Sequence, residues 1–139
     1  MQWSDYFTGL ALKVAAKSKD PSTKVGAILV DKHQAIISTG FNGFAKGEGD
    51  RWPRRVIHAE MHTLIFAYRT RLAGSTLYVT KAPCKHCAAI ICQFHDLYGP
   101  LSVVCPPIER AGSRWANSQE AAAKQFAEVG VDVFFTEFL

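Results

Sequence analysis

Apolar side chains recur at helical spacing in two parts of the chain, and end signals mark another helix. Residues 3–17 carry them at intervals of three and four, which predicts an amphipathic helix. Pro21 then ends it, because a proline biases the preceding residue away from helical conformation. A second apolar stripe predicts a helix over residues 59–72. The stretch NSQEAAAKQFAEVG predicts another, with Asn117 as N-cap and Gly130 at the C-terminal cap.

Strand-like stretches separate these helices. KVGAILVD and AIISTGF, joined by a turn at DKHQ, predict an antiparallel hairpin over residues 24–41. STLYVTK, LSVVCPP and VDVFFTEF predict three more strands, and APCKHCAAIICQFHD predicts a helix that begins at a proline. The order α-β-β-α-β-α-β-α-β predicts an α/β fold. We expect a mixed five-stranded sheet with helices on both faces and parallel strands in its later β-α-β units.

The length and composition of the chain fit one globular domain. Its 139 residues are the size of a single domain, so we expect one domain over residues 1–139. A hydrophobic content of 48% is enough for a packed core. No apolar run approaches the ~20 residues that span a bilayer, and the first twenty residues lack the segments of a signal peptide. We therefore expect a cytoplasmic protein with no membrane partner.

The chain carries a mild positive charge. Its formal net charge is +4 at pH 7, and its Lys and Arg residues are scattered, with one denser patch at residues 51–55. Such a charge suits a solvated surface, and it also suits attraction of an anion such as a phosphorylated metabolite. Because no extended basic stripe is present, we do not expect a nucleic-acid partner.

Two of the four cysteines offer the first candidate chemistry. Cys84 and Cys87 stand as C-x-x-C at a predicted helix start, where free amides and the helix dipole favour thiolates. Taken alone, this spacing fits a redox dithiol, half of a zinc site or two buried thiols. Cys92 lies in an apolar helical stretch and Cys105 ends a buried strand, so we expect both to be core residues.

The stretch HAEMH, at the start of the second helix, supplies partners for the two cysteines. A redox dithiol would not explain this stretch. Three protein ligands with a water in the fourth position are the pattern of catalytic zinc, and His58 can complete such a set. Glu60 can face the same pocket, although an acidic residue also suits a helix N-terminus by itself.

The spacing of HAE and PCKHC resembles the zinc-dependent cytidine deaminase superfamily, whose signature is His-x-Glu followed by Pro-Cys-x-x-Cys. The order of elements is similar to that family's three-layer αβα sandwich over most of the chain. The resemblance implies one catalytic Zn²⁺ held by His58, Cys84 and Cys87, and Glu60 as the proton shuttle. Residues 44–57 contain no Cys or His, so we do not expect the second, structural zinc of some relatives.

Two further stretches, SKDPSTKVGAILVD and STGFNGFAKG, resemble deoxycytidylate deaminases. The resemblance favours hydrolytic deamination of dCMP, supplying dUMP for thymidylate synthesis. The alternatives are the same chemistry on dCTP or another cytosine nucleotide, or on adenosine in RNA. A different class of function is a zinc-stabilised binding module in which Glu60 only caps a helix. The resemblance also implies a homo-oligomer, often a hexamer.

Residue types near these motifs indicate where a nucleotide would be bound. Asn42 can hydrogen-bond the sugar 3′-hydroxyl, or it can serve only as a turn residue. Backbone groups around Ala59 and the turn at residues 83–84 are expected to read the base edge. His62 departs from the family pattern, which usually has Asn there, and we expect it to pack or hydrogen-bond rather than bind zinc. The candidates for the 5′-phosphate are Ser18, Lys19, Lys24 and Arg114.

Overall fold

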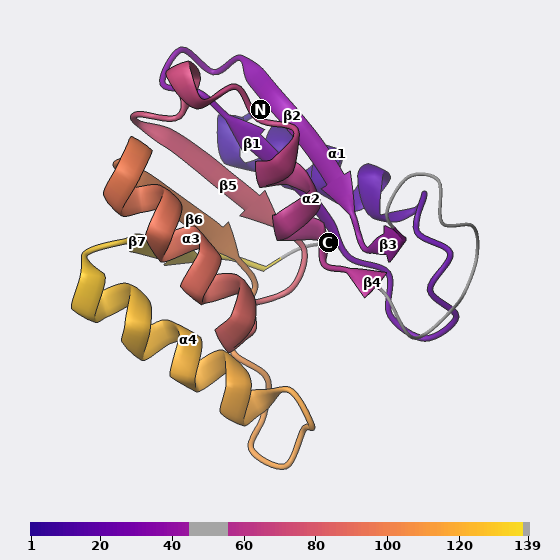
Figure 1. The fold of residues 1–139 in the computed structure, drawn as a ribbon. Helices are drawn as coiled ribbons and strands as arrows, with labels where there is room; N and C mark the ends of the chain where they lie inside the picture. Colours follow the sequence, from indigo (N-terminus) through magenta and orange to yellow (C-terminus); the bar gives the residue numbers. More distant parts are fainter. Residues whose placement is uncertain (45–55, 138–139) are drawn as a thin grey trace.

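A five-stranded sheet forms the centre of the computed structural model, which describes residues 1–44 and 56–137 (Figure 1). The strand order is β2-β1-β5-β6-β7. β1 pairs antiparallel with both β2 and β5, whereas β6 lies parallel to β5 and β7. The predicted mixed sheet, with its opening hairpin and later parallel units, is confirmed. The strands are β1 (Gly26–Val30), β2 (Ile36–Phe41), β5 (Ser75–Val79), β6 (Leu101–Cys105) and β7 (Asp132–Phe135).

Helices cover both faces of the sheet, as predicted. α1 (Trp3–Ala15) lies on one face, and α2 (Ala59–Ile65), α3 (Lys85–Tyr98) and α4 (Ala116–Val129) lie on the other (Figure 1). Every residue of β1 is buried because successive side chains point to opposite covered faces. Ile28 packs with Phe7 of α1, and Leu29 belongs to the larger core cluster beneath the other three helices.

The second helix is shorter than its apolar stripe predicts. α2 ends at Ile65 rather than near residue 72, and a 3₁₀ helix, η1 (Arg69–Arg71), follows it. The reason is that the stripe mixes buried and exposed positions: Leu64 is 2% exposed, but Ile65 is 61% exposed. Apolar spacing alone therefore overstated the helix.

Two other local predictions need correction. α4 begins at Ala116 with Trp115 as its N-cap, so Asn117 lies inside the first turn rather than at the cap. Just before this start, the hydroxyl and the carbonyl of Ser113 accept hydrogen bonds from the amides of Trp115 and Ala116. Gly130 does end the helix in the left-handed conformation, with φ of 92°. The segment between β2 and α2 also contains an antiparallel strand pair that the sequence did not predict, β3 (Gly43–Phe44) with β4 (Val56–Ile57).

Within the described ranges, no helix is both long and apolar enough to span a membrane. The basic patch noted at residues 51–55 lies outside the residues that the structure describes.

Candidate active site

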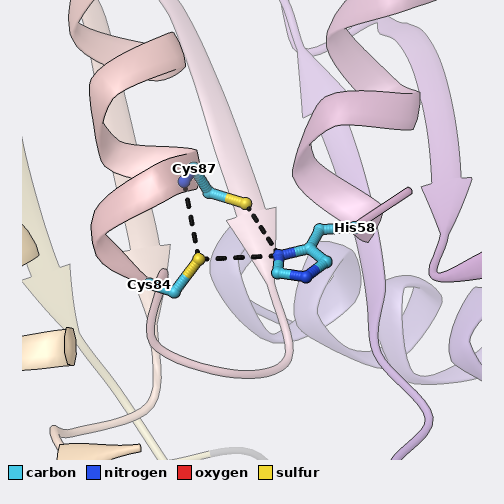
Figure 2. Close-up of side chains that lie close together, drawn as sticks. All are labelled: His58, Cys84 and Cys87. Atoms are coloured by element: carbon cyan, nitrogen blue, oxygen red, sulfur yellow. Dashed lines mark hydrogen bonds between the residues drawn. The ribbon is translucent and has the colours of Figure 1, made fainter. Parts of the chain in front are cut away.

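Three side chains with metal-binding atoms converge where α2 and α3 begin (Figure 2). His58 precedes α2 in an extended conformation, and Cys84 precedes α3 in the same way. His58 Nδ1 lies 3.2 Å from Cys87 Sγ and 3.5 Å from Cys84 Sγ. Both helices cover the same face of the sheet, so residues far apart in the sequence meet at their N-terminal ends.

The geometry and chemistry of this donor set fit zinc. Zn–N bonds of about 2.0–2.1 Å and Zn–S bonds of about 2.3 Å at a tetrahedral angle place N and S about 3.6 Å apart. Both separations in the structure lie close to that value. Among the described residues, no other group of three His, Cys, Asp or Glu side chains is placed to hold a metal ion. The donor set therefore accounts for a single zinc ion.

The two cysteine thiols differ in their readiness to ionise. A hydrogen bond from the Cys87 side chain lowers the pKa of Cys84 to about 3. Burial opposes this change, whereas His58 and the backbone amide of Cys87 assist it. That amide belongs to the first turn of α3, where free N–H groups stabilise a thiolate. The pairing with Cys84 and burial raise the pKa of Cys87. Metal binding displaces the remaining thiol proton.

Glu60 lies beside the metal-binding group, in the first turn of α2, and is only 5% exposed. Burial raises the pKa of its carboxyl, although a hydrogen bond from its own backbone amide and the nearby His58 oppose the change. The carboxyl also interacts with the Cys87 thiol. A buried carboxyl with a raised pKa beside a metal-binding group is the kind of group that general acid–base catalysis uses.

A cavity of about 410 Å³ opens beside these side chains. Its volume falls within the range of about 300–1,000 Å³ that is typical of small-molecule sites. His58, Ala59, Glu60 and Cys84 line it from the two helix starts. Its other polar or charged lining residues are Asp20, Ser22, Thr23, Asn42, Lys81, Arg114 and Gln119.

Asn42 ties two segments of the cavity wall together. Its Nδ2 donates to Asp20 Oδ2 at 3.1 Å and to the Thr23 carbonyl at 2.9 Å. Its Oδ1 accepts a hydrogen bond from the Val25 amide at 2.9 Å. Both Nδ2 hydrogens are thus committed, and one Oδ1 lone pair remains for a ligand. Asn42 is therefore part of the wall as well as a candidate ligand contact.

The structure brings one of the four predicted phosphate residues to the cavity. Arg114 is among the lining residues. Ser18 is buried, and its hydroxyl donates to the Asn42 carbonyl at 2.8 Å, so it supports the wall from behind. Lys19 and Lys24 are exposed and do not line the cavity. A phosphate contact by Ser18, Lys19 or Lys24 stays a prediction, because none of the three lines the cavity.

The sequence reasoning missed the residues grouped around Arg114. Lys81 lines the cavity, and its Nζ lies 3.7 Å from the centre of the Trp115 ring and 3.6 Å from Glu109 Oε2. No motif spacing links positions 81, 109 and 115 in the sequence. The only available signal was the place of Lys81, three positions before the first cysteine of PCKHC.

Comparison with known proteins agrees with this site. The family model for the cytidine and deoxycytidylate deaminase zinc-binding region matches residues 1–98. The chain is 37% identical to an uncharacterised deaminase in the luxG 3′ region of Aliivibrio fischeri, over 95% of this chain and 92% of that protein. The chain therefore belongs to the cytidine and deoxycytidylate deaminase family, and the expected zinc cofactor is confirmed by the matching zinc-binding region.

Two further relatives carry more specific names. Human deoxycytidylate deaminase is 33% identical over 67% of this chain, and the match spans 60% of the human protein. A crystal structure of the dCMP deaminase from cyanophage S-TIM5, in complex with dCMP and dUMP, has a TM-score of 0.72. It is 23% identical over 95% of each chain. At that identity the likeness confirms the cytidine deaminase-like α/β fold.

Proposed function

We propose that this protein deaminates dCMP to dUMP and ammonia, supplying dUMP for thymidylate synthesis. The observation that carries the proposal is the buried Glu60 beside the group His58, Cys84 and Cys87, at a cavity large enough for a nucleotide. The names of the human and cyanophage relatives support dCMP in particular. A binding module would not need a buried carboxyl with a raised pKa beside its metal ligands.

The chemistry divides between the metal and one side chain. A zinc ion held by these ligands would lower the pKa of its water to about 7, making the water a nucleophile at neutral pH. Glu60 accepts a proton from the water as the oxygen attacks C4 of cytosine. Glu60 passes that proton to N3, then takes the remaining proton from the attacking oxygen and delivers it to the amino nitrogen, so that the C4–N bond breaks, a C4=O bond forms and ammonia leaves.

The remaining cavity residues orient the nucleotide. We assign the free lone pair of Asn42 Oδ1 to the sugar 3′-hydroxyl, because both Nδ2 hydrogens are already used. Backbone groups at Ala59 and at the turn before α3 lie beside the metal group and can read the base edge. Arg114 stands at the cavity as a cation for the 5′-phosphate.

A substrate profile tests the proposal. Purified zinc-loaded protein is assayed on dCMP, CMP, dCTP, cytidine and an RNA adenosine substrate, by loss of cytosine absorbance and by ammonia release. We expect the highest kcat/KM on dCMP. Activity on dCTP or RNA without activity on dCMP would contradict the substrate assignment, and the absence of any turnover would contradict the enzyme assignment.

We also propose a cytoplasmic homo-oligomer, of which a hexamer is one form, built from a single domain over residues 1–139. Large apolar side chains exposed on the outside of the fold support self-association, among them Ile65, Tyr68 and Leu97. Four free cysteines suit a reducing compartment. Sedimentation equilibrium tests the association, because a monomer at micromolar concentration would contradict it.

A further inference from the structure

Lys81, Arg114 and Trp115 form a cationic wall at the cavity, separate from the metal-binding group. Lys81 Nζ lies 3.7 Å from the Trp115 ring centre, and the Arg114 guanidinium carbon lies 4.5 Å from it. Contact with an aromatic face favours a cation and limits where it can move. All three residues line the cavity. The wall therefore presents two positive charges to whatever the cavity binds.

The carboxylate that partners Lys81 does not face the cavity. Glu109 lies 3.6 Å from Lys81 Nζ, but it is not among the lining residues. Its Oε1 accepts a hydrogen bond from the Ser113 hydroxyl, and its Oε2 accepts one from Gln119 Nε2. Glu109 is thus held behind the wall by neighbouring side chains. Glu109 pairs with Lys81 alone, and no described carboxylate lies within ion-pair distance of Arg114.

The two acidic residues that line the cavity, Asp20 and Glu60, form no ion pair with Lys81 or Arg114 in the part of the chain that the structure describes. Asp20 already accepts hydrogen bonds from the amides of Ser22 and Thr23, from the Ser22 hydroxyl and from Asn42. An ammonium has three N–H donors, and Glu109 is the one acceptor found near Lys81 among the described residues. Lys81 therefore keeps donors for a ligand in the cavity.

We propose that Lys81, held on the face of Trp115 and backed by Glu109, binds the 5′-phosphate and makes the enzyme prefer a nucleotide to a nucleoside. Lys81 is a specificity-determining residue in this scheme, and Arg114 assists it from the same ring. A compact ammonium suits a phosphate group as a point charge. Lys81 can act in this way only if the substrate is the nucleotide proposed above.

The test compares how variants discriminate dCMP from deoxycytidine. The discrimination is the ratio of kcat/KM for dCMP to kcat/KM for deoxycytidine, and the Kd values of dUMP and deoxyuridine give it independently of turnover. Lys81→Met should lower the ratio by about 10- to 100-fold, as expected for one lost hydrogen bond to a charged group. Lys124→Met is the matched control, because Lys124 is exposed on α4 and does not line the cavity.

Glu109→Gln separates phosphate binding from a purely structural ion pair. Removing the competing carboxylate should raise the ratio, in the opposite direction to Lys81→Met. If Lys81 and Glu109 only stabilised the wall, both variants would shift the ratio the same way or leave it unchanged, and either result would overturn the proposal. An equal loss on both substrates in Lys81→Met would overturn it too. No wild-type turnover of dCMP would instead overturn the proposed function.

Discussion

His62 Nδ1 donates a hydrogen bond to the carbonyl oxygen of Phe41 at 2.7 Å. This bond joins α2, which carries Glu60, to the last residue of β2, which precedes Asn42 in the cavity wall. The acceptor is a backbone carbonyl, so Nδ1 carries the hydrogen. The hydrogen-bonding role expected for His62 is confirmed, and the residue links two parts of the site without being a metal ligand.

Replacing His62 by Leu should weaken the fold and the substrate site together. The change leaves the half-buried Phe41 carbonyl without this donor, and we expect a cost toward the lower end of the about 1–3 kcal/mol found for buried groups. We expect a lower free energy of unfolding in urea and a higher KM for dCMP. His33→Leu is the control, because His33 is exposed at the β1–β2 turn and should change stability by less than ~0.5 kcal/mol. Equal stability of both variants would contradict the link.

Asp20 should make stability depend on pH. Burial alone would raise the pKa of its carboxyl, but hydrogen bonds from Ser22, Thr23 and Asn42 outweigh burial and lower it below 3.8. The stabilisation by Asp20 is therefore full above pH 3.8 and is lost as pH falls through the lower folded-state pKa.

Asp20→Asn should accordingly be less stable than the wild type at pH 7, and the difference should shrink below about pH 4. Urea unfolding at a series of pH values measures it. Asp96→Asn, at an exposed position of α3, serves as the control. A difference in the free energy of unfolding that stays constant from pH 7 to pH 3 would show that the Asp20 charge does not stabilise the folded protein.

Zinc content should depend on the three converging ligands and not on neighbouring residues. We expect about one zinc per chain in the wild type and a loss of bound zinc in His58→Ala, measured by atomic emission. His86→Ala is a close control, since His86 lies between the two cysteines but is exposed and outside the metal group. Full zinc content in His58→Ala, or loss of zinc in His86→Ala, would contradict the ligand assignment.

Zinc removal should also lower thermal stability. A ligand that binds only the folded state stabilises it by mass action. When the zinc is removed, that stabilisation is lost and the buried Cys87 thiol regains its proton. Excess chelator should reduce Tm, and added Zn²⁺ should restore it. An unchanged Tm after verified metal removal would show that the site does not contribute to folding stability.

Much of the site could be predicted because its residues occur in two short, recognisable stretches. HAE and PCKHC both lie at helix starts, and local sequence fixes where those helices begin. The predicted end of α2, near residue 72, was wrong because apolar spacing does not distinguish buried Leu64 from exposed Ile65.

The wall around Trp115 could not be predicted from local sequence. Lys81 follows β5, Glu109 lies between β6 and α4, and Trp115 immediately precedes α4. Their proximity depends on how the parallel strands and α4 pack, which no local pattern records. The same holds for Ser18, whose hydroxyl meets the carbonyl of Asn42 across 24 positions of sequence.

The most direct measurement is turnover of dCMP by the wild type and by Glu60→Gln, with zinc content determined on the same samples. The central claim is that Glu60 moves the protons while His58, Cys84 and Cys87 hold the metal. It predicts wild-type conversion of dCMP to dUMP, and a loss of about 10²- to 10⁴-fold in kcat for Glu60→Gln at unchanged zinc content. Undiminished turnover by zinc-loaded Glu60→Gln would contradict it.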